Sequence, residues 1–163
     1  MTENILTQEL LHELFNYKNG NLYWKKNKGT ALADSLAGCI ATNGYRQIRI
    51  NGKKHLAHRV IFFMFYGYFP KEIDHIDHNK DNNSIENLRP TNASDNCKNV
   101  RKKSSNKTGC KNVCWVKRDK KYRVHLRING KQKCFGYFND IELAELVAHE
   151  ARNKFYKEFA CHI

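Results

Sequence analysis

Residues 74–96 read D-H-I-D-H-N-K-D-N-N-S-I-E-N-L-R-P-T-N-A-S-D-N, and the rest of the 163-residue chain is best understood from them. These twenty-three residues hold five carboxylates, two histidines and six asparagines, with few apolar side chains between them. A helix or strand built only for packing does not have this composition. The pattern predicts a site for a metal ion and a general base, set in a polar loop.

The two ends of this stretch carry the groups that such a site needs. Asp74 offers a carboxylate and Asn96 an amide oxygen, and a hard cation such as Mg²⁺ binds through oxygen while keeping several waters. The imidazole of His75 can accept a proton from water near neutral pH. Neighbouring residues of a strand point to opposite faces, so Asp74 and His75 can address different partners. We expect Ser84 to cap a helix, so that strand, loop and helix bring Asp74 and Asn96 face to face.

The motif D-H-x-D-x-N-K-x-N-N at residues 74–83, with asparagines at 87 and 96, resembles the His-Asn-His (HNH) homing endonucleases of the phage and intron type, which have a ββα-metal core. The resemblance implies that Asp74 and Asn96 bind one divalent ion, Mg²⁺ or Mn²⁺. It also implies that His75 is the general base, and that Asn87 pins the loop and orients the histidine.

The resemblance implies a metal-dependent, site-specific DNA endonuclease that hydrolyses a phosphodiester bond. One active site per chain predicts that a monomer nicks one strand, so a double-strand break needs a dimer or two events. His78 and Pro90 depart from the family pattern, which usually has a glycine and often has an aromatic residue there. These departures concern the turn geometry more than the chemistry.

Other functions fit the same stretch less well. One alternative is a sequence-specific DNA-binding regulator whose nuclease core is vestigial. A ribonuclease is disfavoured, because the second half of the chain predicts a sheet that binds nucleic acid. The major groove of A-form RNA is too deep and narrow for such a sheet to read. A structural calcium loop is disfavoured too, because the EF-hand frame and its final glutamate are missing.

Charge and cysteine content narrow the class of protein further. A net charge of +13 and a pI of about 9.5 predict a polyanionic partner, either nucleic acid or an anionic membrane surface. No apolar run approaches the ~18 residues of a membrane span, and the first residues lack a secretory signal pattern. We therefore expect a cytoplasmic protein that binds double-stranded DNA, in the bacterial host if a phage encodes it. The six cysteines form no C-x-x-C pair, so reduced thiols are expected and a structural zinc is not.

The expected fold class is α+β. Residues 5–16 place apolar side chains at helical spacing, with Thr7 as the N-cap. Asn-Gly pairs at 19–20 and 51–52 predict tight hairpins, so a small antiparallel sheet precedes the ββα-metal core. The apolar segment 58–67 predicts a buried helix that supports the catalytic loop.

Several basic residues and a histidine lie at the start of that segment and in the sheet before it. His58 is expected to be a structural, hydrogen-bonded side chain, and Arg59 to contact a phosphate. Four basic residues of the preceding sheet could equally lie on a phosphate or form a solvated face: Arg46, Arg49, Lys53 and Lys54.

The second half of the chain is more basic. Fourteen Lys or Arg and a single acid lie between residues 98 and 133, which favours contacts with phosphates. Three short strands are predicted at 111–117, 121–128 and 131–138, followed by a helix from Asp140 to about Tyr156. The apolar face of the sheet should pack on this helix, through a stripe of Leu143, Val147, Ala151 and Phe155.

This half resembles the ethylene-response-factor (Apetala-type) DNA-binding domain. The resemblance covers residues 104–160 and is carried by S-N-K-T-G, W-V-K-R, K-x-R-V-H-L-R-I-N-G-K, F-G-Y-F and A-x-x-V-A-H-E-A-R-N-K-F-Y-K-E-F-A. It implies that the sheet reads a DNA major groove. With Arg59, the predicted DNA contacts are Lys111, Arg118, Arg123, His125, Arg127 and Lys133, unless a bulge in the first strand shifts its faces. Trp115 is expected in the core.

The predicted organisation is an HNH nuclease domain at 1–97, with its ββα-metal core at about 55–97. A basic linker at 98–109 and a sheet-plus-helix DNA-binding domain at 110–163 follow. A monomer is expected, and a dimer is the alternative.

Overall fold

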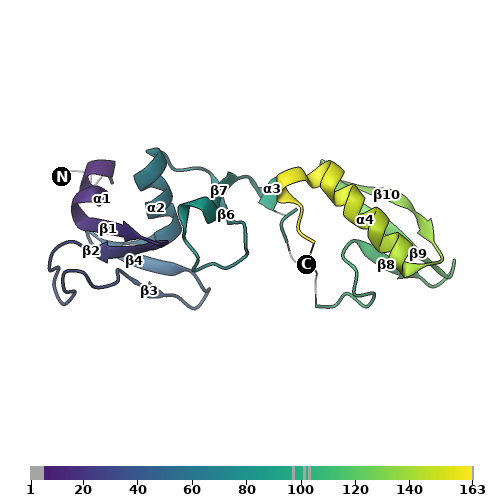
Figure 1. Cartoon of the computed structure of the whole chain (residues 1–163), viewed down its shortest axis with the longest axis horizontal. Coiled ribbons are helices and arrows are strands. Elements are labelled where there is room, and N and C mark those ends of the chain that lie inside the picture. The colour runs from purple at the N-terminus through teal and green to yellow at the C-terminus, as the bar shows by residue number, and fades with distance from the viewer. Residues whose placement is uncertain (1–5, 97, 101, 103, 163) are drawn as a thin grey trace. The chain divides into compact units, whose positions relative to one another are not determined.

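The computed structural model describes residues 6–96, 98–100, 102 and 104–162. The chain divides into two compact units, Met1–Thr91 and Asn92–Ile163 (Figure 1). Both combine short antiparallel sheets with helices, which agrees with the expected α+β class. The domain limits at residues 97 and 109 stay a prediction, and residues 97, 101 and 103 lie outside the described ones.

The first unit begins with a helix and a hairpin. Helix α1 spans Gln8–Leu14, and the Thr7 side chain accepts a hydrogen bond from the Leu10 N–H at 3.2 Å, as the sequence predicts. Strands β1 (Phe15–Lys18) and β2 (Asn21–Trp24) follow. The two residues of the turn between them, an Asn-Gly pair, have φ values of 48° and 78°. Positive φ at both positions is the signature of the predicted tight hairpin.

A three-stranded antiparallel sheet lies next in the chain. Strand β4 (Arg46–Ile50) pairs with β3 (Cys39–Ile40) on one side and β5 (Lys53–Leu56) on the other. Helix α2 (Ala57–Tyr66) follows at once and ends at Gly67, whose φ of 74° is the left-handed cap that glycine favours. The buried helix expected at 58–67 is therefore confirmed.

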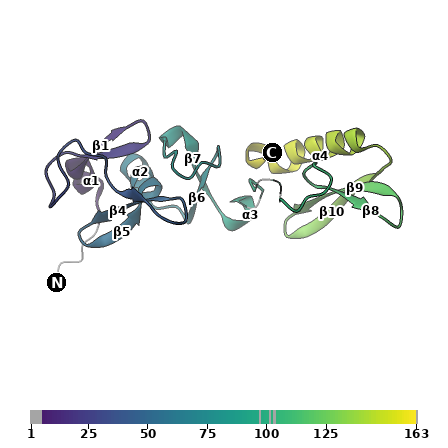
Figure 2. The ribbon, with the colours of Figure 1, turned by 90° about the horizontal axis from the view of Figure 1, so that it is seen from below.

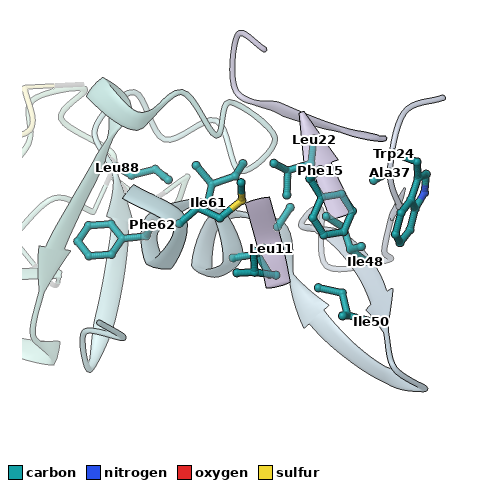
Figure 3. Close-up of a cluster of buried hydrophobic side chains, with 13 residues drawn as sticks. Leu11, Phe15, Leu22, Trp24, Ala37, Ile48, Ile50, Ile61, Phe62 and Leu88 are labelled. Carbon is teal, nitrogen blue, oxygen red and sulfur yellow. The ribbon is translucent and has the colours of Figure 1, made fainter. Parts of the chain in front are cut away.

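One apolar core joins these elements. Figure 3 shows side chains of α1, the hairpin, β4 and α2 pointing toward one another. Phe15, Ile48 and Phe62 are each only 1 % exposed, and Ile61 is fully buried. Helix α2 thus packs against strands of both small sheets. The polar stretch follows α2 in the chain after a short connection.

The polar stretch is arranged differently from the prediction. Strand β6 (Glu72–His75) pairs antiparallel with β7 (Leu88–Thr91), and only one 3₁₀ turn, η1 (Ile85–Asn87), lies between the loop and β7. The helix predicted after Ser84 is wrong, and the Ser84 side chain makes no capping bond. The strand is favoured because pairing satisfies the backbone groups of both strands and buries Leu88 to 5 % exposure. The short helix α3 (Ala93–Asn96) belongs to the second unit.

The second unit is a sheet with one long helix. Strands β8 (Val113–Val116), β9 (Lys121–Ile128) and β10 (Lys131–Phe138) form a sheet in the order β10-β9-β8 (Figure 2). Helix α4 (Ile141–Tyr156) packs on it, and the Asp140 side chain caps it by accepting from the Leu143 N–H at 2.9 Å. A 3₁₀ turn, η2, follows α4. The predicted strands and helix are confirmed, with β8 shorter than expected.

The face of α4 that meets the sheet differs from the predicted stripe. Its buried apolar residues include Ala144, Ala148 and Ala151, whose small side chains allow the helix to lie close to the sheet. Leu143 is 48 % exposed, so its place in the stripe was wrong. Val147 and Phe155 lie at the margin of the core.

Part of the predicted linker is folded into this unit. The Thr108 hydroxyl donates to the carbonyl of Val113 at 3.0 Å, and the Asn106 amide donates to the carbonyl of Cys110 at 2.8 Å. These bonds fasten residues 106–110 to the start of β8. The last part of the predicted linker, residues 106–110, is therefore part of the folded second unit.

The cysteines and the helices of the described residues bear on two other predictions. Free thiols are found at positions 39, 110, 114, 134 and 161, and Cys97 lies outside the described residues. None of the described helices combines the length and the apolar character that crossing a membrane requires.

Candidate active site

Asp74 and His75 lie side by side on β6 and are almost buried, at 8 % and 5 % exposure. Each faces a different residue of β7, because Asp74 is opposite Arg89 and His75 is opposite Leu88. They therefore occupy opposite faces of the two-stranded ribbon, as expected of neighbours on a strand. A carboxylate and an imidazole are thus presented in two directions from one rigid element.

The Asp74 carboxylate forms an ion pair that the sequence did not reveal. Its Oδ2 accepts hydrogen bonds from Arg89 Nε at 2.9 Å and Nη2 at 2.7 Å. The two side chains are 9 % and 14 % exposed, so the pair is largely shielded from water. Cross-strand pairing fixes the direction of the carboxylate.

Asn87 fastens the two ends of the loop together. Its amide nitrogen donates to Asp77 Oδ1 at 2.9 Å and to the carbonyl of Asn82 at 2.7 Å, and its Oδ1 accepts from the Asp77 N–H at 3.0 Å. Burial alone would raise the pKa of Asp77, but hydrogen bonds from Asn82, Asn79 and Asn87 outweigh it and lower that pKa. The contacts fit the pinning role that the resemblance implies for Asn87.

The side chain that bonds His75 is Asn83, which the sequence analysis did not single out. His75 Nε2 lies 3.1 Å from Asn83 Oδ1, and Asn83 is 1 % exposed. Its sequence signal was weak, because Asn83 is one of several asparagines in the loop.

Arg46 holds the same loop from the sheet. Its Nε and Nη2 each donate to one carboxylate oxygen of Asp81 at 3.0 Å, and its Nη1 donates to the carbonyl of Gly38 at 3.4 Å. Arg46 is only 9 % exposed. The possibility that Arg46 lies on a phosphate is therefore wrong, since its guanidinium is committed to the loop. Arg49 and the two lysines of β5 are exposed.

His58 packs against His75 from the start of α2. The ring centroids are 5.1 Å apart and nearly perpendicular, and Tyr45 contacts both rings. Burial, reinforced by the charges of His75 and Arg59, lowers the pKa of His58 to about 3. The expectation of a hydrogen-bonded His58 is not met at one atom, because Nδ1 has no partner among the described residues.

We expect His58 to make the protein less stable as pH falls. The unfolded chain protonates His58 near its ordinary pKa of 6.5, whereas the folded chain resists protonation down to about 3. The contribution of uncharged His58 to the free energy of unfolding is therefore fully present above pH 6.5. Below that pH it falls by up to about 1.4 kcal/mol per pH unit. Urea unfolding at several pH values should show a flatter slope for His58→Phe than for the wild type. Equal slopes would contradict this assignment.

The two predicted metal ligands, Asp74 and Asn96, are oxygen donors. Among the described residues there is no cluster of three or more His, Cys, Asp or Glu that could hold a metal. Mg²⁺ can bind through only one or two protein oxygens, completed by water and phosphate. Asn96 ends α3, where its N–H donates to the carbonyl of Asn92 at 2.9 Å. The pairing of Asp74 with Asn96 remains a prediction.

Two residues predicted to contact DNA, Arg59 and Lys111, have partners within the fold. Arg59 Nη2 donates to the carbonyl of Pro70 at 3.0 Å, and its guanidinium lies over the Phe69 ring. Lys111 donates to the carbonyls of Val100 and Cys161, and burial lowers its pKa. These bonds engage donors of both residues in holding the fold, and their contact with DNA stays a prediction.

Strand β9 separates its side chains as predicted. Val124 and Leu126 are fully buried against α4, so Arg123, His125 and Arg127 take the opposite face. Arg127 is exposed and its Nε donates to the carbonyl of Gly130 at 3.1 Å. This opposite face is called the outer sheet face below.

The remaining candidates lie elsewhere. Lys133 is opposite Leu126, so it lies on the helix side, with its ammonium 5.2 Å from the Phe155 ring. It therefore lies on the face opposite to that of Arg123, His125 and Arg127, and its contact with DNA stays a prediction. Arg118 is exposed and pairs with its neighbour Asp119.

A hollow of about 930 Å³ opens in the second unit between residues 98–108 and the first two strands. Five lysines line it, at positions 98, 102, 107, 111 and 117, and none of the described residues that line it is an acid. Trp115 also lines it, is 44 % exposed and contacts Tyr122, so its expected place in the core was wrong. The charge of this hollow favours an anionic partner.

Comparisons with known proteins identify a family for the region that contains Asp74 and His75. The family model for HNH endonucleases matches residues 55–98, close to the core predicted at 55–97. Protein 3.8 of Escherichia phage T7 is 33 % identical over 96 residues, which are 58 % of this chain and 74 % of that protein. No solved structure matches. The chain therefore belongs to the same family as Protein 3.8 of phage T7 and carries an HNH endonuclease domain, whose relatives use a divalent metal to cut DNA.

Proposed function

We propose that this protein is a site-specific DNA endonuclease of the homing type, which uses a divalent metal and nicks one strand per active site. The observation that carries the proposal is the arrangement on β6. There a fixed carboxylate, Asp74, and a fixed imidazole, His75, lie on opposite faces within the HNH match.

Each residue has a distinct task in the proposed reaction. Asp74 and Asn96 would hold Mg²⁺ or Mn²⁺, which when bound stabilises the charge on the phosphate and on the departing oxygen. His75 removes a proton from water, and the resulting hydroxide attacks the phosphorus in line. Asn87 keeps the loop closed, and Arg89 holds the Asp74 carboxylate in one direction.

One observation favours the alternative of a DNA-binding regulator with a vestigial nuclease core. Asp74 is bonded to Arg89, and an arginine is a competitor for the carboxylate that would hold the metal. The alternative predicts tight DNA binding without cleavage, so a single assay separates the two functions.

The assay is conversion of supercoiled plasmid by the full chain with Mg²⁺, with Mn²⁺ and with EDTA. We expect relaxed, nicked circles with either metal and none with EDTA. Linear product formed directly from supercoiled DNA in a single turnover would contradict nicking. Intact plasmid with both metals, on a target that the protein binds, would favour the regulator.

We also propose that the outer sheet face docks in a DNA major groove, which a β-ribbon or sheet can enter. Arg123, His125 and Arg127 share that face, and the hollow beside it is lined by lysines. Burial and the charge of Arg123 lower the pKa of His125, so His125 would contact DNA as a neutral side chain.

Arg127→Ala should weaken DNA binding and reduce its salt dependence. Loss of one phosphate contact lowers the slope of log K against log salt by about 0.9. Lys154→Ala is the matched control, because it removes one exposed positive charge from α4 and not from the sheet. The measurement is DNA affinity at several salt concentrations. Equal slopes for both variants would argue against docking by this face.

A further inference from the structure

We propose that Asn83 is a positioning residue that holds His75 in the tautomer with its hydrogen on Nε2, so that Nδ1 is the atom that takes the proton from water. This inference rests on the proposed nuclease function for its purpose, but the tautomer itself can be observed without cleavage. The tautomer matters because a neutral imidazole has one donor nitrogen and one acceptor nitrogen, and only the acceptor can be a base.

The orientation of the Asn83 amide decides which nitrogen of His75 carries the hydrogen. The Asn83 nitrogen donates to the carbonyl of Asp81 at 3.4 Å, which leaves Oδ1 directed at His75 Nε2, 3.1 Å away. An amide oxygen can only accept, so Nε2 must be the donor. The lone pair of the neutral ring then lies on Nδ1.

Burial allows the hydrogen bond from His75 to Asn83 to select the tautomer of His75. Asn83 is 1 % exposed and His75 is 5 % exposed, so water cannot easily replace either partner. The opposite tautomer would place the His75 lone pair against the amide oxygen, leaving two acceptors facing each other. A buried polar atom without a suitable partner is unfavourable, so the Nε2–H form is selected.

Three elements of the first unit fix the loop on both sides of Asn83. Before it, Arg46 on β4 holds the Asp81 carboxylate with two bonds. After it, the Tyr17 hydroxyl on β1 accepts from the Ile85 N–H at 3.0 Å. The turn at Gly20 lies so close that a Cβ there would be 2.6 Å from the Ser84 nitrogen. The small sheets thus support the loop that holds the proposed base.

The test uses the full chain labelled with ¹⁵N and reads the His75 ring nitrogens by NMR, with His75→Gln to assign the signals. We expect the wild type to show hydrogen on Nε2. Asn83→Leu keeps a similar volume but offers no acceptor, and it should populate the Nδ1–H form. Asn79→Ala is the matched control, because Asn79 accepts from the Asp81 N–H in the same loop instead of bonding the histidine. It should keep the wild-type pattern.

Cleavage provides the second reading. Under single-turnover conditions with saturating DNA, Asn83→Leu should cut about tenfold more slowly, with DNA affinity unchanged. Persistence of the Nε2–H form in Asn83→Leu would overturn the proposal, and Asn83→Ala gives the same decision if the leucine variant does not fold. If Asn83→Leu changes the tautomer but the wild type never cleaves DNA, the nuclease function fails while the role of Asn83 stands.

Discussion

His75→Ala should lower DNA cleavage by ~10²–10⁴-fold, the usual contribution of a general base, while DNA binding is retained. His75 is 5 % exposed and held on β6, so its loss removes a fixed proton acceptor rather than a mobile surface group. The measurement is the single-turnover rate on plasmid or on an oligonucleotide target at saturating protein.

His78→Gly is the matched control for that experiment. His78 lies in the same loop with φ of 63°, a conformation that glycine adopts without strain. This change also removes one imidazole, yet we expect it to leave cleavage nearly unchanged. Equal loss of cleavage in both variants would show that the loop, and not the His75 base, is what the reaction needs.

Asp74→Asn should lower metal-dependent cleavage on the order of 10³-fold, because a bound metal supplies several kcal/mol of charge stabilisation and each 1.36 kcal/mol is tenfold in rate. The variant should also lose some stability. The bonds from Arg89 would then end on a neutral amide oxygen, and a hydrogen bond between charged groups is worth about 1.5–3 kcal/mol. Cleavage rate and urea unfolding are measured on the same preparation.

Arg89→Gln separates the two tasks of Asp74. It breaks the same ion pair and should lose similar stability, but it leaves the carboxylate in place. We therefore expect Arg89→Gln to cleave far better than Asp74→Asn. If the two variants lose cleavage equally, Asp74 serves as a structural partner of Arg89, and the metal assignment is wrong.

The sequence predicted local structure well where one residue type answers one local need. Asn-Gly pairs placed the hairpin turns, and Asp140 placed the start of α4. It failed where neighbours in space decided. The segment after Ser84 had the composition of a capped helix, yet it pairs with β6 as a strand. Leu143 had helical spacing, yet alanines take the contact with the sheet.

The sequence by itself determined the kinds of chemical group in the candidate site and their order along the chain. Asp74 and His75 had to face opposite ways on a strand, because alternation is a property of extended backbone. Only the tertiary structure decided which polar groups meet. Arg46 bonds Asp81 across 35 residues, and no local pattern encodes that pairing. Of the many asparagines in the loop, burial selects Asn83 for His75, because a hydrogen bond shielded from water tolerates only one fitting partner.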